Sequence, residues 1–194
     1  MLRPTMARKE SEVTGSPTEY GTVPAPATVR FERLLPGPID RVWAYLIEQD
    51  KRKQWLAGGE MELKVGGQAS LLFKHSEFTE EPAPEKYAEM SQKGFLSRHL
   101  ITEIDPPRRL AMTWPGEEGH ESEIIFELFP EGDKVMLVVT HKRLRDTDEM
   151  TNVASGWHAH LAVLETVLEG GRADRFWSHI AVLETEYQRR FAER

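Results

Sequence analysis

The residues of this chain best suited to chemistry are its histidines, two of which stand close together in SGWHAHLAVLETVLEGG, residues 155–171. His158 and His160 are two positions apart, which places them about 200° apart around a helix axis. Two metal ligands on one helix need a spacing of three or four residues to point the same way. The pair therefore does not predict a metal site, and we expect no bound metal.

The two histidines are expected to have different surroundings. His158 shares a side of the helix with Glu165 and Glu169, opposite much of the apolar stripe, so we predict a solvated surface residue. His160 lies at the edge of that stripe, beside Trp157. It either faces a cavity as a polar anchor for a ligand or is a hydrogen-bonded histidine at the boundary of the core.

Catalysis would need a nucleophile or base together with an orienting group. Ser155 is not in a G-x-S-x-G setting, and no aspartate stands beside a histidine in the sequence. The acidic residues of the segment 77–85 are explained more simply by solvation. The pairs Gly66-Gly67 and Gly170-Gly171 lack the lysine of a phosphate-binding loop. We therefore predict no catalytic residue and no cofactor.

Aromatic residues supply the other candidates for a ligand site. Trp114 is either a core residue or part of a pocket wall. Trp55 follows two short predicted helices and is expected near the mouth of a pocket, and Phe73 and His75 end a strand just before a long polar segment. The predicted ligand-binding residues are Trp55, Phe73, Trp114, Trp157, His160, Leu161 and Leu164.

Length and composition exclude several classes of function. The 194 residues suffice for one core, and 25 Lys and Arg against 32 Asp and Glu give a net charge of −7. Nucleic-acid binding needs a basic face, so none is expected. The chain has no cysteine, which excludes disulfides and cysteine-bound zinc. No apolar run reaches the ~20 residues of a membrane span, and the first residues lack the apolar core of a secretory signal, so we expect a cytoplasmic protein.

The spacing of apolar residues predicts the elements that position these side chains. Residues 1–26 are polar and rich in proline, which favours a mobile tail. Alternation with a period of two predicts a strand at 28–35, followed by a short helix at 39–47 and a second short helix or turn at 48–56. Six further strands are expected in antiparallel succession, the first at 61–65, turning through Gly66-Gly67. The segment 75–94 is expected to be a long loop, either a lid or a binding loop.

Two helices complete the predicted fold. The first runs from 147 to 170, and its stripe of residues three or four apart includes Met150, Trp157, Leu161 and Leu164. The second carries the stripe Phe176, Ile180, Leu183, Tyr187 and Phe191. This last stripe either docks on the chain's own domain or forms the interface of a homodimer.

Four stretches resemble the SRPBCC superfamily, also called START or Bet v 1-like, over residues 28–170. They are RFERLLPGPIDRVWAYL (30–46), QWLAGGEMEL (54–63), DPPRRLAMTW (105–114) and SGWHAHLAVLETVLEG (155–170). Within it, the chain most resembles the branch named after the C-terminal domain of the activator of Hsp90 ATPase.

The resemblance implies an α+β helix-grip fold. A curved antiparallel sheet of about six to seven strands would wrap around a long C-terminal helix, with two short helices after the first strand. The domain would span 27–170, and residues 171–194 would form an additional C-terminal helix packed on it.

Members of the superfamily bind lipids, polyketides or hormones between sheet and helix, act as cyclases or hydratases, or assist Hsp90. The resemblance therefore implies a small hydrophobic ligand as the main partner. An enzyme that uses His160 as general base in the same pocket is a second hypothesis. A co-chaperone with an Hsp90-type partner is a third. The separate N-terminal domain of eukaryotic activators is not expected here, and with the added C-terminal helix this weighs against the third hypothesis.

Overall fold

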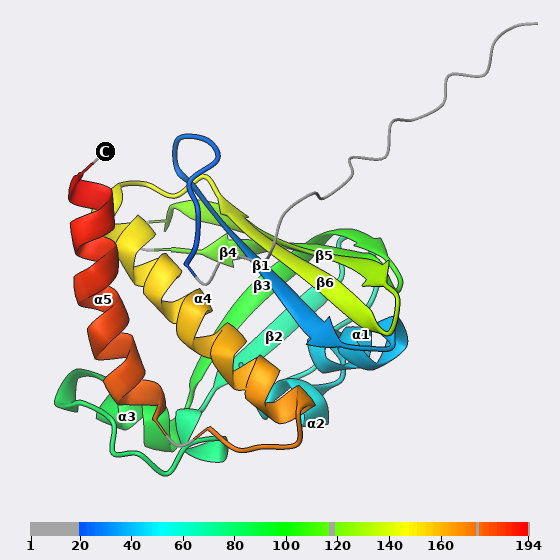
Figure 1. Ribbon diagram of the computed structural model, residues 1–194, viewed down its shortest axis with the longest axis horizontal. Helices are drawn as coiled ribbons and strands as arrows, with labels where there is room; N and C mark the ends of the chain where they lie inside the picture. Colours follow the sequence, from blue (N-terminus) through cyan, green and yellow to red (C-terminus); the bar gives the residue numbers. More distant parts are fainter. Residues whose placement is uncertain (1–19, 117–118, 174, 194) are drawn as a thin grey trace, which may run out of the picture.

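The computed structural model describes residues 20–116, 119–173 and 175–193. Its strands are β1 (Thr28–Pro36), β2 (Gln68–Phe73), β3 (Phe95–Asp105), β4 (Arg109–Pro115), β5 (Glu121–Glu131) and β6 (Lys134–Lys142). Its helices are α1 (Ile39–Ile47), α2 (Gln49–Arg52), the short 3-10 helix η1 (His75–Glu77), α3 (Glu85–Lys93), α4 (Thr147–Leu168) and α5 (Phe176–Ala192). Figure 1 shows how they are arranged.

The strands form one antiparallel sheet with the order β1-β6-β5-β4-β3-β2. β2 to β6 follow the chain as a meander, and β1 closes the sheet beside β6, with Thr28 opposite Lys142. The register of β3 against β4 shifts between Ile101 and Glu103, which marks a bulge. Bulges bend strands, so this one adds to the curvature of the sheet.

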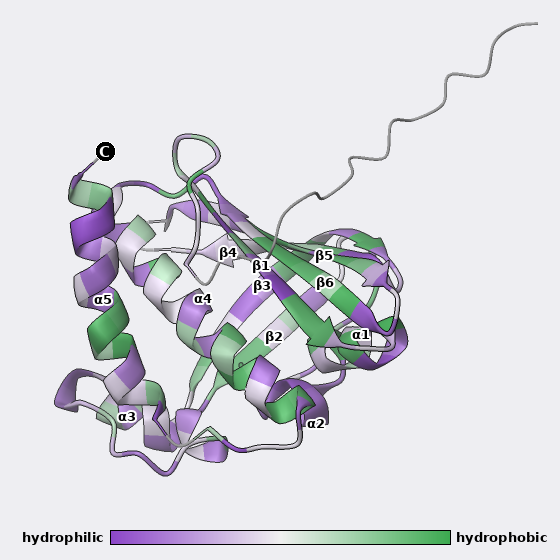
Figure 2. Cartoon of the chain, viewed as in Figure 1, coloured by the Kyte–Doolittle hydropathy of each residue, from purple (hydrophilic) through white to green (hydrophobic). Residues whose placement is uncertain are grey.

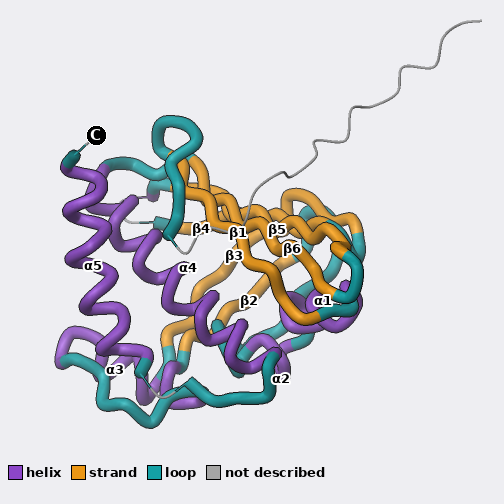
Figure 3. Tube along the Cα trace, in the orientation of Figure 1, coloured by secondary structure: helices purple, strands orange, loops and turns teal. Residues whose placement is uncertain are grey.

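The long helix α4 lies across one face of the sheet, and α5 runs alongside α4 (Figure 1). Figure 3 shows the strands gathered on one side and α3, α4 and α5 on the other. In β1 every second residue is buried, including Val29, Phe31 and Leu35, as expected for a strand with one face on the core. The α+β helix-grip fold predicted from the sequence is therefore confirmed.

Two segments differ from the sequence prediction. Residues 61–65 do not form a strand, since Met61 makes only an isolated bridge to Ala69. The segment 75–94 is not a plain loop, because it contains η1 and the nine-residue helix α3. Gly94 ends α3 with a φ of 87°, a conformation that favours glycine.

Helix α5 packs its apolar stripe against its own chain. Phe176, Trp177, Leu183, Tyr187 and Phe191 are buried. Both hydrophobic and hydrophilic turns are visible along the helix in Figure 2. Most of the stripe is therefore covered within one chain, as expected for a helix that docks on its own domain.

Most of the predicted mobile tail, 1–26, lies outside the described residues, but its last residues are held in place. The backbone N–H of Gly21 donates to the Tyr187 hydroxyl at 2.8 Å, and Thr22 bridges to Arg30. The Tyr20 ring packs edge-on against Tyr187, with the Arg190 guanidinium 3.8 Å from the Tyr20 ring centre. This segment therefore belongs to the packed structure.

Candidate functional site

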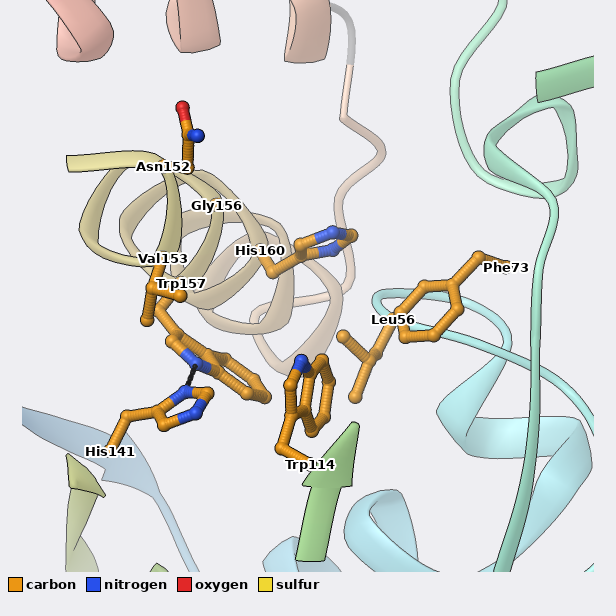
Figure 4. A pocket seen from close by; sticks show the side chains of 9 residues that line it. All are labelled: Leu56, Phe73, Trp114, His141, Asn152, Val153, Gly156, Trp157 and His160. Carbon is orange, nitrogen blue, oxygen red and sulfur yellow. Dashed lines mark hydrogen bonds between the residues drawn. The ribbon is translucent and has the colours of Figure 1, made fainter. Parts of the chain in front are cut away.

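A cavity of about 250 Å³ lies between α4 and the sheet, and we call it the Trp114 chamber. Its wall is mostly apolar and aromatic, and Figure 4 shows the side chains of Trp114, Trp157 and Leu56 converging on it. The residues that line it are Leu56, Phe73, Trp114, His141, Asn152, Val153, Gly156, Trp157 and His160. The two histidines are the ionisable residues among them.

A hydrogen-bond chain fixes one wall of the Trp114 chamber. The Trp157 indole N–H donates to His141 Nδ1 at 3.0 Å, the bond drawn in Figure 4. The Ser122 hydroxyl donates to the Trp114 carbonyl at 3.1 Å, so it accepts from His141 Nε2, 2.8 Å away. Both nitrogens of His141 are thereby used within the protein. Burial lowers the pKa of His141 to about 3, which keeps the ring neutral.

His160 has one nitrogen free to contact a ligand. Its Nδ1 lies 2.7 Å from the Trp55 carbonyl oxygen, which can only accept, so Nδ1 carries the proton. Burial lowers the pKa of His160 to about 4, so the ring is neutral and Nε2 is an acceptor. No described residue donates to Nε2. In Figure 4 the ring projects from α4 toward Phe73.

A second cavity of about 200 Å³, which we call the Trp177 chamber, adjoins the first. The two share Phe73, Asn152, Gly156 and His160. Beyond these, the second chamber is lined by residues of η1, α3, β3, α4 and α5, namely His75, Tyr87, Met90, Phe95, Ser155, Trp177, Ile180 and Glu184. The segment 75–94 and α5 therefore build a cavity wall that the core fold alone would not supply.

The floor of the Trp177 chamber is an aromatic cluster. The His75 ring lies 4.7 Å from Trp177, 5.1 Å from Phe176 and 5.5 Å from His160, measured between ring centres. His75 Nδ1 and the Trp177 indole nitrogen are buried without a hydrogen-bond partner among the described residues. Burial lowers the pKa of His75 to about 3. A charged imidazole would be costly in this cluster.

The structure distributes the predicted ligand-binding residues over two roles. Phe73, Trp114, Trp157 and His160 line the Trp114 chamber. Trp55 is fully buried behind the wall, where its indole N–H donates to the Tyr45 carbonyl at 2.9 Å and its own carbonyl holds His160. It therefore does not lie at a pocket mouth. Leu161 and Leu164 are also fully buried, in the core, and line neither chamber.

The expectation for His158 was wrong, because its side chain is only 4% exposed. Helix α5 covers this side of α4, and the Tyr187 hydroxyl lies 3.0 Å from His158 Nδ1. Since that hydroxyl already accepts from the Gly21 N–H, it is placed to donate to His158. Burial lowers the pKa of His158 to about 3.

Sequence reasoning also missed Arg52 and the lining residues Leu56, Asn152, Val153 and Gly156. Arg52 is 1% exposed, and its guanidinium donates to the backbone carbonyls of residues 46, 47, 57, 58 and 59. It joins the end of α1 to the segment that carries Leu56 into the cavity wall. Gly156 was detectable as a lone glycine inside a strong helical pattern.

The site is chemically suited to binding. Its only cavity-facing titratable groups in the Trp114 chamber are His141, which is fully hydrogen-bonded, and His160. In the part of the chain that the structure describes, no three His, Asp or Glu side chains are grouped to hold a metal ion. Within the same residues, no helix is long and apolar enough to cross a bilayer.

Comparison with known proteins agrees with this architecture. Residues 36–169 match the family model described as activator of Hsp90 ATPase homolog 1-like protein. A Bordetella parapertussis protein encoded by gene BPP1335 is 46% identical, with 90% of this chain and 91% of that chain covered and a TM-score of 0.77.

More distant structures share the fold alone. CalU16 from Micromonospora echinospora is 20% identical over 86% of each chain, with a TM-score of 0.63. DynU16, a protein of the dynemicin biosynthetic locus, is 20% identical over 75% of this chain and 48% of its own, with a TM-score of 0.58. No curated protein matches the chain.

Proposed function

Because the chain belongs to the activator of Hsp90 ATPase homologue 1-like family of the SRPBCC superfamily, we propose that it binds a small, uncharged apolar molecule in the Trp114 chamber. The observation that carries the proposal is a cavity of about 250 Å³ walled by tryptophan, phenylalanine and leucine side chains, with one free acceptor nitrogen on His160. Moving apolar ligand surface out of water contributes roughly 25 cal/mol per Å². The fixed Trp157–His141 bond keeps the wall in place before the ligand arrives.

Charge and polarity favour a neutral ligand. The wall of the Trp114 chamber has no lysine, arginine, aspartate or glutamate. A carboxylate or ammonium group would lose its hydration there without gaining an opposite charge. The ligand is therefore expected to be held mainly by aromatic contacts, with a polar contact to His160.

Binding can be tested with N-phenylnaphthylamine, an uncharged aromatic probe whose fluorescence rises in apolar sites. We expect saturable binding of one probe per chain. Val153→Phe places a larger side chain at the cavity wall and should weaken binding at least about tenfold. Val182→Phe is the matched control, because Val182 is 66% exposed on α5, and it should change nothing. Equal effects of the two variants, or no binding at all, would refute the proposal. Native mass spectrometry of protein purified from its source host adds a search for a retained ligand.

A co-chaperone role is favoured by one observation, the family description itself. In that case the protein would raise the ATPase rate of its host's Hsp90-type chaperone without any small ligand. An assay of that rate, with and without the purified protein, separates the two functions. Stimulation that survives Val153→Phe, together with no probe binding, would favour the chaperone partner.

An enzyme of the cyclase or hydratase kind would use the same chamber, with His160 as its base. A neutral imidazole with a free Nε2 is the correct protonation state for this role. Its pKa of about 4 makes it a weak base, however, and its Nδ1 partner is a backbone carbonyl, where a carboxylate would raise its basicity. Binding without turnover is therefore the proposal that the geometry favours, and we place it in the cytoplasm.

A further inference from the structure

Gly156 occupies an unusual position for a glycine. It lies in the middle of α4, where a glycine costs about 1 kcal/mol of helix stability relative to alanine. Close packing does not explain it, because a Cβ atom built at this position meets no atom within 4 Å. Its backbone needs no left-handed conformation either, since it is not among the glycines with positive φ. What the missing side chain leaves open is the space between the two chambers, because Gly156 lines both.

His160 stands at the same boundary and fixes the chemistry there. It lines both chambers, it is 7% exposed, and its Nδ1–H is held by the Trp55 carbonyl. The remaining nitrogen, Nε2, can therefore accept a hydrogen bond but cannot donate one. No described residue offers it a donor. Nε2 is not among the buried atoms that lack a partner, so it is open to the chambers. A ligand that displaces water from it without supplying an O–H or N–H group would lose about 1–3 kcal/mol, so the site favours a ligand with such a donor.

The size of the chambers makes a ligand in both of them reasonable. Ligand pockets are usually about 300–1,000 Å³. The Trp114 chamber, at about 250 Å³, is below this range when taken alone, and the Trp177 chamber adds about 200 Å³. Both have apolar walls, with Trp157 and Leu56 in the first and Met90 and Ile180 in the second.

From these observations we infer that the two chambers form one site for an elongated, neutral molecule that has an apolar group at each end and a hydroxyl or N–H donor between them. The donor would lie against His160 Nε2, over the gap that Gly156 leaves open. Glu184 in the far wall disfavours a carboxylate at that end. The inference rests on the proposed function and extends it, since it assigns the chemical class of the ligand and enlarges the site by the Trp177 chamber.

Three probes of the same shape test the chemical class. Diphenylmethanol has two rings and a central O–H donor, benzophenone has a central acceptor only, and diphenylmethane has neither. We expect the alcohol to bind about tenfold more tightly than either of the others, as measured by NMR shifts of the indole and amide groups. His160→Asn keeps an N–H donor for the Trp55 carbonyl, and its amide oxygen ends one bond short of the Nε2 position, so no acceptor remains at that position. It should abolish the preference for the alcohol without unfolding the protein.

Gly156 variants test the passage. Gly156→Ala and Gly156→Leu retain or improve helix propensity, so loss of folding is not expected. Both variants should weaken the binding of diphenylmethanol, Gly156→Leu more than Gly156→Ala and by at least about tenfold. Benzyl alcohol is short enough for one chamber, so its affinity should change by less than about twofold in either variant.

The outcomes separate this inference from the proposed function. If all three two-ring probes bind equally, or if leucine at position 156 affects both alcohols alike, the ligand class and the continuous site are wrong, while apolar binding stands. If N-phenylnaphthylamine and all the other probes fail to bind, the proposed function and its extension are both wrong.

Discussion

At the scale of single residues, Arg52 holds the segment that shapes one wall of the site. Its guanidinium satisfies carbonyls at the C-terminus of α1 and in the segment 57–59, with no carboxylate among these contacts. Burial lowers its pKa to about 10, so it remains charged at neutral pH. The charge is dispersed over backbone dipoles, and Leu56 and Trp55 are positioned as a result.

Replacing Arg52 should therefore destabilise the fold strongly. Arg52→Met leaves several buried carbonyls without a donor and is expected to lower the free energy of unfolding by about 3 kcal/mol or more. Arg52→Lys keeps the charge but lacks the planar fork of donors, so it should recover only part of the loss. Urea denaturation measures both variants. Full recovery by lysine would show that charge alone, and not the fork, is what this position needs.

The bond between Trp157 and His141 can be tested by itself. Trp157→Phe removes the indole N–H and leaves His141 Nδ1 without a donor, which should cost about 1–3 kcal/mol of stability. In a His141→Phe background the same change should cost less, because no acceptor is left unsatisfied. A double-mutant cycle from urea denaturation gives the coupling energy. Strictly additive effects would mean that the bond contributes nothing beyond packing.

Sequence reasoning reached some of these residues and missed others for a physical reason. Trp157 and His160 were detectable because they lie on or beside the apolar stripe of one helix. His158 was misassigned because a single helix shows only one apolar stripe, whereas α4 is covered on a second side by α5. The role of Arg52 depends on carbonyl directions, which no side-chain pattern encodes.

At the scale of elements, α4 depends on its first turn. The Asp146 side chain accepts from the Glu149 backbone N–H at 2.8 Å and so caps the helix. Asp146→Ala should destabilise the protein by about 1 kcal/mol, and Asp146→Asn by less, because an amide oxygen can still accept. Thermal denaturation of the three proteins at neutral pH gives the comparison. An alanine variant as stable as the parent would show that this cap contributes little to the fold.

Helix α3 was missed in the sequence because it has few apolar anchors. Within Glu85–Lys93, Tyr87 and Met90 are the large apolar residues that pack on the core, and they give too short a stripe for a helical pattern. What holds α3 is tertiary contact, since Tyr87 stacks on Trp177 with ring centres 5.1 Å apart. A strand at 61–65 was predicted from the hairpin signal Gly66-Gly67, but in this segment Met61 makes only an isolated bridge.

The Tyr87–Trp177 contact should therefore control the mobility of α3. Tyr87→Ala is expected to raise hydrogen exchange across residues 85–93 strongly while lowering global stability by only about 1 kcal/mol. Lys93→Ala is the matched control on the same helix. Its exposed ion pair with Glu89 lies within α3 and is worth about 0–1 kcal/mol, so exchange should change little. Equal hydrogen exchange in Tyr87→Ala and in the parent protein would show that other contacts hold α3.

At the scale of the whole molecule, helices and sheet together remove five histidines from water. His99 and His141 are buried beside Trp114, His158 between α4 and α5, and His75 and His160 beside the chambers. Each buried ring has a lowered pKa, with burial as the first cause, to about 3 for His75, His141 and His158 and to about 4 for His160. The layered architecture that makes the cavity therefore also makes the fold sensitive to acid.

The direction of that sensitivity follows from where protons bind. The unfolded chain takes up protons on these histidines below a pH of about 6.5, whereas the folded chain resists until pH 3 to 4, so acid favours unfolding. Stability should be fully present above the unfolded pKa and should fall as the pH drops below it, by up to about 1.4 kcal/mol per pH unit for each histidine. Urea denaturation at several values between about pH 8 and about pH 5 measures the slope of the free energy of unfolding against pH. His75→Phe should reduce the slope by the contribution of one histidine, because phenylalanine does not bind a proton. A slope unchanged by this variant, or equal stability at both ends of the range, would contradict the neutral burial of these rings.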